Sequence, residues 1–298
     1  MADITLEPRL SLEKEVKGRS LWSDARHRLL QNHAAVASAL ILIIIVLLSF
    51  FGPYFAPHTF DEVSWDFIDS PPNFEAGFYF GTDQNGRDLF VRTLNGGQVS
   101  ITIGVVATLV SLVIGVSWGA LAGFVGGRVD DAMMRIVDIL YSIPFIFFVI
   151  MLTVVVGRHY WVMYVAIGAV SWLDMARIVR GQTLSLKRKE FVEAAHASGV
   201  STFNIIRRHI VPNTLGPVII YVTLTVPTVM LTESFISFLG MGVQEPNSSW
   251  GVLVSEGSRT MDTSWWGLVF PCFFLSMTLL CLNYLGDGVR DALDPKDR

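Results

Sequence analysis

The 298-residue sequence has few charged residues and only two cysteines. Asp, Glu, Lys and Arg make up 16% of it, against about 25% in a typical soluble protein, whereas hydrophobic residues make up 52%. This composition excludes a single soluble domain, a disordered chain and a collagen. Cys272 and Cys281 share one apolar run, about 13.5 Å apart along a helix, which is too far for a disulfide. A disulfide-stabilised scaffold is therefore excluded as well.

Motifs for catalysis and nucleotide binding are also absent from the sequence. There is no G-x-x-x-x-G-K-[ST] loop to cradle nucleotide phosphates, and no H-E-x-x-H or G-x-S-x-G motif. The six histidines are scattered and form no pair at the spacing of metal ligands on a helix. The sequence therefore predicts no catalytic residue, no metal site and no cofactor in this chain, and it favours a conduit over a catalyst.

Six uncharged runs explain the low charge. They hold 117 residues, so the other 181 carry all 48 charged side chains, which is an ordinary density for a soluble protein. Crossing a bilayer core about 30 Å thick takes roughly 20 helical residues, and five runs have 18 or more. Backbone polar groups in hydrocarbon must pair within the segment, which favours helices. The runs are 34–51, 101–125, 139–156, 160–173, 214–232 and 263–285.

We therefore predict an all-α, polytopic membrane protein with six transmembrane helices. For the short run 160–173 a buried or re-entrant segment is the alternative, but its helical pattern can continue through Asp174 into Arg177 and Arg180. A further helix on the membrane surface is predicted within residues 20–33, with a solvated linker as the alternative. The predicted organisation is an N-terminal segment (1–33), a first transmembrane helix (34–57), an outer loop (58–98), a five-helix core (99–285) that contains the loops 174–213 and 240–262, and a tail (286–298).

The distribution of Lys and Arg predicts the orientation, because cytoplasmic loops carry an excess of both. Of the 22 basic residues, 18 fall in the N-terminal segment, the 126–138 and 174–213 loops and the tail. Only Arg87, Arg92, Arg158 and Arg259 fall on the opposite side. Both termini and the 174–213 loop are therefore expected in the cytoplasm.

Two features inside the apolar runs are candidates for packing and for function. Gly115, Gly119 and Gly123 recur every four residues, a spacing that lets two helix backbones approach closely, either within this chain or against another. Glu233 is an acid deep in an otherwise apolar stretch. An intramembrane carboxylate is a functional candidate, so Glu233 is the candidate residue of a transport pathway. The alternative is that it only reaches the membrane interface.

The 174–213 loop is the most informative segment outside the membrane. Its sequence fits two short helices joined at Gly199, which can adopt the left-handed conformation that ends a helix. Pro212 is expected to break the second helix, and Asn213 to cap the following span. The result is a compact cytoplasmic projection whose small Ala194–Ala195 surface fits into a partner's groove.

These residues carry a resemblance to a known family. Glu193-Ala194-Ala195, followed by Gly199 and later Pro212, resembles the E-A-A-x-x-x-G loop of bacterial ABC importer permeases. The generic pattern has an apolar residue at the position of His209, and the form His209-Ile-Val-Pro-Asn213 is similar to the peptide-and-nickel subfamily instead. Further segments resemble the second, C-type permease of dipeptide and oligopeptide importers: 81–88, 134–135 with Pro144, 237–242 with 250–251, and 286–295.

The resemblance runs from about Gly18 onward and implies the type I ABC importer permease fold. It implies a chain in the bacterial inner membrane that is not an enzyme and that moves oligopeptides to the cytoplasm by alternating access. The implied partners are a homologous second permease, two ATPase subunits that bind ATP and Mg, a periplasmic peptide-binding protein facing the outer loops, and the lipid bilayer, with no nucleic acid. The implied ATPase-coupling residues are Glu193, Ala194, Ala195, Gly199, His209 and Pro212.

Other interpretations remain open from the sequence. A dipeptide or nickel permease is the alternative within transport, and a membrane scaffold that moves nothing is the alternative from another class. The outer segments Gly81-Thr82-Asp83 and Asn85-Gly86 are typical of turns, and a docking contact is an equal alternative. A bulky Ala195→Arg is expected to block coupling to the ATPases.

Overall fold

The computed structural model describes residues 21–157 and 160–293. Residues 1–20 of the predicted N-terminal segment and 294–298 of the predicted tail lie outside the described residues. Within the described ranges the regular elements are all helical, with two isolated β-bridges and no strand. The longer elements are α1 (Leu21–Gln31), α2 (His33–Phe51), α3 (Leu89–Val125), α4 (Gly127–Ser142), α5 (Phe145–Val156), α6 (Tyr160–Leu186), α7 (Glu190–Ala197), α9 (Val211–Phe238), α10 (Trp250–Arg259) and α11 (Trp266–Leu293). The short elements are the 3₁₀ turns Gly52–Phe55 and Trp65–Phe67, α8 (Thr202–Ile205) and a π-helical turn (Ile206–Ile210).

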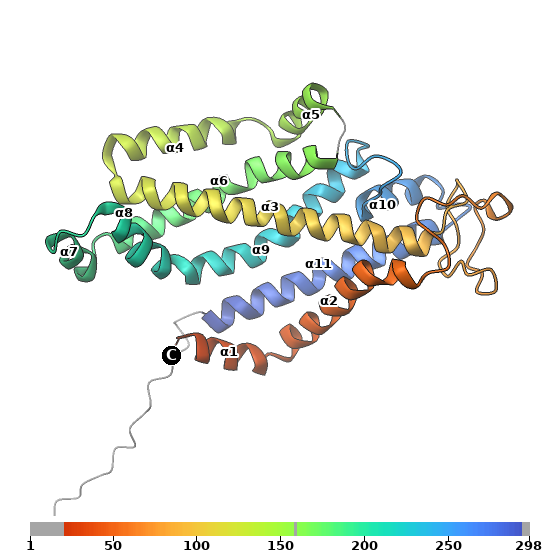
Figure 1. The fold of residues 1–298 in the computed structure, drawn as a ribbon, viewed down its shortest axis with the longest axis horizontal. Helices are drawn as coiled ribbons and strands as arrows, with labels where there is room; N and C mark the ends of the chain where they lie inside the picture. Colours follow the sequence, from red (N-terminus) through yellow and green to blue (C-terminus); the bar gives the residue numbers. More distant parts are fainter. Residues whose placement is uncertain (1–20, 158–159, 294–298) are drawn as a thin grey trace, which may run out of the picture.

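The long helices lie side by side, with α3 in the middle between α6, α9 and the pair of α2 and α11 (Figure 1). At one end of the molecule lie α7, α8, α1 and the C-terminal end of α11. The loop that connects α2 to α3 lies at the other end. The described parts of both terminal regions are therefore at the same end as the predicted 174–213 projection.

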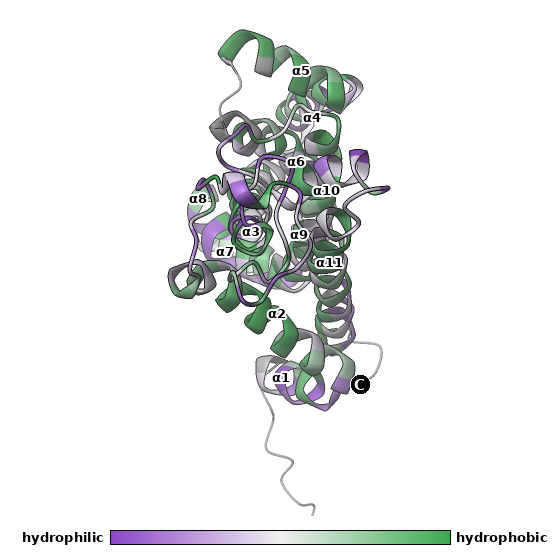
Figure 2. Cartoon of the chain, turned by 90° about the vertical axis from the view of Figure 1, so that its right-hand side faces the viewer, coloured by the Kyte–Doolittle hydropathy of each residue, from purple (hydrophilic) through white to green (hydrophobic). Residues whose placement is uncertain are grey.

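Four helical segments among the described residues are long and apolar enough to cross a membrane: His33–Phe55, Leu89–Val125, Thr202–Phe238 and Trp266–Leu293. A fifth arises if α4 and α5 form one broken span. Figure 2 shows apolar residues along most of α2 and α5. The helix α6 continues from the apolar run through Asp174, Arg177 and Arg180 to Leu186, which confirms that the predicted helical pattern extends past the run.

The run 139–156, predicted to be helical, is broken near Pro144 and does not form one straight helix. α4 ends at Ser142, α5 begins at Phe145, and the two are bent by 82°. Pro144 explains the break, because its ring disfavours a helical conformation in the preceding residue. Ile143 is indeed extended, with φ −79° and ψ 119°.

The glycines of α3 let it pack closely on α6. A side chain at Gly119 would meet the backbone oxygen of Ala176 and the nitrogen of Arg180, and one at Gly123 would meet the oxygen of Arg180 at 2.9 Å. Gly115 approaches Met175 in the same way. The close helix approach predicted from the glycine spacing therefore occurs within this chain, where the sequence left a partner chain as the alternative.

Pro212 does not break the helix that precedes α9, which contradicts the prediction. The helix runs from Thr202 to Phe238, with a π-helical turn at 206–210 just before the proline. The wider turn pairs the Val211 N–H with the Ile206 carbonyl five residues back, so the ladder is already displaced where Pro212 lacks an N–H. Asn213 does not cap a helix start either, because its Nδ2 donates to the His209 carbonyl at 2.6 Å.

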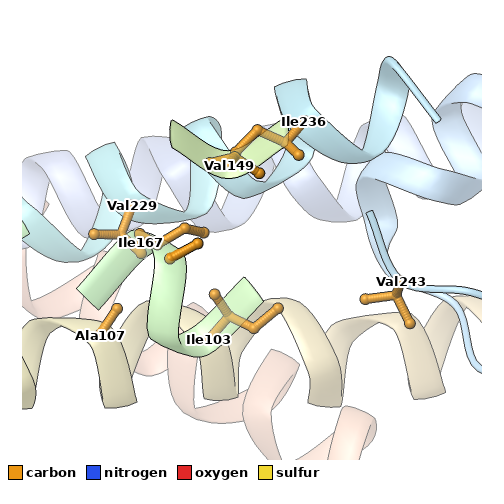
Figure 3. Close-up of a cluster of buried hydrophobic side chains, with 8 residues drawn as sticks. Ile103, Ala107, Val149, Ile167, Val229, Ile236 and Val243 are labelled. Carbon is orange, nitrogen blue, oxygen red and sulfur yellow. The ribbon is translucent and has the colours of Figure 1, made fainter. Parts of the chain in front are cut away.

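Apolar packing between α3, α6 and α9 forms the centre of the molecule. Figure 3 shows side chains of α3, α6 and α9 converging, with Val149 of α5 beside Ile236 of α9. The buried members of this cluster are Ile103, Ala107, Val149, Ala166, Ile167, Val229, Ile236 and Val243. This core fixes how α6 and α9 emerge toward the end that carries α7 and α8.

Candidate functional site

The predicted projection forms a knob, which we define as residues 187–210. Its first helix, α7, ends in a Schellman motif: the Gly199 N–H donates to the His196 carbonyl at 3.0 Å, and the Val200 N–H to the Ala195 carbonyl at 3.2 Å. Gly199 has φ +77°, the left-handed conformation expected from the sequence. The tight turn directs the chain back into α8, so the knob consists of two short helical segments folded against each other.

An apolar inner face holds the knob on the transmembrane helices. Val192 of α7 packs in one cluster with Ile205 and Ile210, which are fully buried, and with Phe124 at the end of α3. Ala195 is half-buried against the same cluster. A force on α7 would therefore be transmitted through direct packing to α3 and to the helix that leads into α9.

The opposite face of the knob is open to solvent. Glu193 and Ala194 are exposed, and the bulky Phe191 and Phe203 are 42% and 70% exposed. Within the described residues Glu193 has no side-chain hydrogen bond or ion pair, so its carboxylate is available to a partner. Exposed aromatic rings around a small alanine surface are typical of a protein–protein contact.

The structure brings all six sequence-predicted coupling residues into the knob or its base. Glu193, Ala194 and Gly199 are exposed on the knob, and Pro212 is exposed just below it. The ring of His209 is half-buried, with its centroid 6.3 Å from that of Phe191. Their roles in ATPase coupling stay predictions.

Ion pairs brace the helices beneath the knob. Arg180 of α6 donates to both carboxylate oxygens of Asp130 on α4, at 2.6 and 2.7 Å. Arg177 donates to Asp138, about two turns further along α4, at 2.8 Å, and its guanidinium lies 4.3 Å from the ring centroid of Tyr141. α4 and α6 are thus tied together on the side of the molecule where the knob projects.

Glu233, the predicted pathway residue, lies apart from the knob in a buried junction of three helices. Its side chain is 0% exposed. It accepts hydrogen bonds from Ser237 Oγ at 2.6 Å and from Ser100 Oγ of α3 at 3.0 Å. Ser100 Oγ in turn accepts the Trp250 N–H of α10 at 3.2 Å. In this structure Glu233 joins α3, α9 and α10 rather than reaching the surface, and its pathway role stays a prediction.

The outer loops are held by a charged cluster that the sequence analysis missed. Arg92 is 0% exposed, pairs with Asp83, and donates to Glu256 at 3.0 Å. Arg87 donates to Asp83 at 2.8 Å and to Glu245 at 2.9 Å. Because these pairs join the 81–88 turn to the 240–262 loop, the structure favours a structural role for that turn. The only signal in the sequence was the spacing of Asp83, Arg87 and Arg92.

Two adjoining grooves lie beside the central core, and the sequence analysis missed these as well. One, of about 410 Å³, lies between α5, α6 and α9 and is lined by Asp174, Tyr221 and three threonines. The other, of about 760 Å³, is mostly apolar and shares Phe145 and Thr232 with the first. The threonine spacing within the 214–232 run could have indicated a polar face on that helix. Within the described residues no group of three or more His, Cys, Asp or Glu is placed to hold a metal ion.

Comparisons with known proteins agree with this architecture. Residues 115–298 match the family described as "Binding-protein-dependent transport system inner membrane component". Residues 20–72 match the N-terminal TM domain of oligopeptide transport permease C. The chain is 55% identical over 294 residues to the oligopeptide transport system permease protein OppC of Escherichia coli K12, covering 99% of this chain and 97% of the relative. It is 45% identical over 280 residues to the dipeptide transport system permease protein DppC of Bacillus subtilis, covering 94% and 87%.

The fold has a relative among solved structures. A chain of the MetNI methionine ABC transporter, in an inward-facing conformation, superimposes with a TM-score of 0.57 over 69% of this chain and 96% of that chain. The sequences are only 19% identical there, so the likeness concerns the fold. The match over residues 115–298 and the 55% identity over nearly the whole length identify the family. This chain belongs to the inner membrane components of binding-protein-dependent transport systems.

Proposed function

We propose that this chain is a transmembrane permease subunit of an ATP-driven importer that carries oligopeptides from the periplasm to the cytoplasm by alternating access. The observation that carries the proposal is the 55% identity to an oligopeptide permease over 99% of the chain. The exposed outer face of the knob supports it, because a permease without a nucleotide site of its own needs a surface that receives work from an ATPase.

The proposed assembly joins this chain to a homologous second permease, two ATPase subunits and a periplasmic peptide-binding protein. ATP and Mg would be bound by the ATPases and not by this chain. In the knob, Ala194 and Ala195 would form the contact surface and Gly199 the turn. Glu193 would pair with a basic side chain or a backbone N–H of the ATPase, and His209 and Pro212 would shape the base.

The proposed topology has six spans with both termini and the knob in the cytoplasm. It counts α4–α5 as one broken span and α6 as another, and it is supported by the basic residues gathered at the knob end.

The test is labelling of single cysteines, in a background without the two native cysteines, by a membrane-impermeant thiol reagent. Asn85→Cys should react in intact cells, whereas Ser198→Cys should react only after the membrane is opened. Labelling of Ser198→Cys in intact cells would contradict the topology.

A dipeptide permease is the second candidate, because the identity to the dipeptide relative is 45%. The experiment that separates the two compares uptake of labelled tri- to pentapeptides, dipeptides and Ni²⁺ in cells with and without this chain. Loss of tri- to pentapeptide uptake on deletion, restored by the intact gene, is the result expected. Loss of dipeptide or Ni²⁺ uptake alone would overturn the oligopeptide assignment, and unchanged uptake of all three would favour a scaffold.

A further inference from the structure

The groove between α5, α6 and α9 has a polar floor in a membrane-spanning part of the molecule. Tyr221, Thr225, Thr228 and Thr232 follow one another at i, i+4, i+7 and i+11 along α9, which places them on one helix face. The three threonine hydroxyls donate to backbone carbonyls within α9 at 2.8–2.9 Å. Their protons are therefore used, and what each hydroxyl offers to the groove is an oxygen lone pair.

A row of acceptors of this kind suits a ligand rich in N–H donors. A peptide in extended form presents its backbone N–H groups irrespective of its side chains. From Tyr221 to Thr232 the floor rises about 16.5 Å at 1.5 Å per residue. Since an extended chain advances about 3.3 Å per residue, this length accommodates about five residues.

Asp174 adds a charge at the end of the groove nearest the knob. Its side chain is half-buried and lines the groove opposite Tyr221. Within the described residues it has no hydrogen bond and no ion pair, whereas its neighbours Arg177 and Arg180 are paired with Asp138 and Asp130 on α4. Asp174 directly follows the apolar run 160–173, so it lies where the groove opens toward the predicted cytoplasmic side.

The walls of the groove are apolar, in contrast to its polar floor. Phe145 of α5, Ile167 and Val170 of α6 and Val229 of α9 line the same groove, and its neighbour beyond Thr232 is mostly apolar. Apolar walls accept varied side chains without demanding a specific partner. The groove is open on one side, which leaves room for a second subunit to complete the enclosure.

We propose that this groove is the part of the peptide path contributed by this chain. The threonines Thr225, Thr228 and Thr232 accept backbone N–H groups, and Asp174 receives the cationic α-amino group as the peptide reaches the cytoplasmic side. The peptide thus leaves amino end first. The proposal rests on the proposed function and adds the residues, the recognition chemistry and the direction of travel.

The test uses the assembled transporter in proteoliposomes, in a background with Cys272 and Cys281 replaced by serine. Thr228→Cys places a thiol in the groove, and Ile44→Cys places a matched thiol on the exposed face of α2, on the far side of the molecule. A charged, water-soluble thiol reagent should modify Thr228→Cys at least about tenfold faster than Ile44→Cys, because the thiolate that reacts forms only in contact with water. A transported tripeptide should slow the modification.

Asp174→Asn tests the charge separately. Loss of one charge-assisted hydrogen bond should reduce tripeptide uptake about tenfold. Asp174→Glu should restore most of the uptake. Peptide uptake by the transporter without these substitutions is measured first. If that transporter does not carry peptide, the proposed function fails and not the groove proposal. If it does carry peptide but Thr228→Cys is no more reactive than Ile44→Cys, or Asp174→Asn transports normally, the groove proposal is overturned.

Discussion

At the residue scale, Asp88 shows how burial sets a pH dependence outside the membrane-spanning helices. It caps the N-terminus of α3, where its Oδ1 accepts the Phe90 N–H at 2.9 Å, and its buried Oδ2 has no hydrogen-bond partner among the described residues. Burial raises the pKa of the Asp88 carboxyl from 3.8 to about 6, opposed by its hydrogen bond to the Phe90 N–H. The folded protein therefore binds this proton more tightly than the unfolded chain does.

The sign of the effect follows from linkage. Between pH 4 and 6 the folded state holds more protons at Asp88 than the unfolded state, so the free energy of unfolding falls as the pH rises, by about 3 kcal/mol in total. Asp88→Asn keeps a capping oxygen and should abolish this slope. Thermal unfolding of the solubilised protein from pH 4 to 7 is the measurement, with the exposed Asp262→Asn as the control. A slope that persists in Asp88→Asn would contradict the assignment.

Arg92 is the residue on which the outer cluster depends. Replacing it by methionine leaves Asp83 and Glu256 without their shared cation, which should cost about 3 kcal/mol of unfolding free energy. The exposed pair of Arg177 and Asp138 gives the matched control, because Arg177→Met should cost less than about 1 kcal/mol. Equal melting temperatures for the two variants would show that the cluster does not stabilise the fold.

At the scale of elements, the packing of α3 on α6 depends on glycine. In Gly119→Ala the added methyl would collide with backbone atoms of Ala176 and Arg180, which cannot move aside as a side chain can. We expect a loss of about 1–3 kcal/mol. Gly216→Ala in α9 is the control, because no atom of the described part of the chain lies within 4 Å of its added carbon and the change should stabilise the helix by about 0.5–1 kcal/mol. If the melting temperature of Gly119→Ala equals that of the wild type, the close contact is disproved.

The elements also show which features a sequence can reveal. Apolar runs and a glycine spacing depend on local chemistry, so α2, α11 and the contact face of α3 were predictable. Proline disfavours a helical conformation in the residue before it, so a break at Pro144 is within reach of the sequence, although its 82° angle is not. The unbroken helix at Pro212 was not predictable, because a π-helical turn at 206–210 precedes the proline. The outer cluster escaped notice since Arg92 and Glu256 are 164 residues apart in the chain. The knob residues were found because they lie within one short segment.

At the scale of the whole molecule, the proposed function requires that work from an ATPase enter at the knob and reach the spans through packed side chains. Val192 and Ala195 face inward onto Ile205, Ile210 and the end of α3. For that reason Ala195→Arg, which the sequence suggests as a test, would also disrupt the knob's own core. Ala194 is exposed and is the cleaner position.

The most direct measurement is therefore peptide-stimulated ATP hydrolysis and peptide uptake by the reconstituted transporter with Ala194→Arg. Arginine is a good helix former, so α7 should stay folded while the bulky cation obstructs docking. Gln182→Arg, exposed on α6 outside the knob contact surface, is the matched control. Ala194→Arg should lose stimulated hydrolysis and uptake, whereas Gln182→Arg should keep both. Wild-type coupling in Ala194→Arg would contradict the proposed entry of work at the knob.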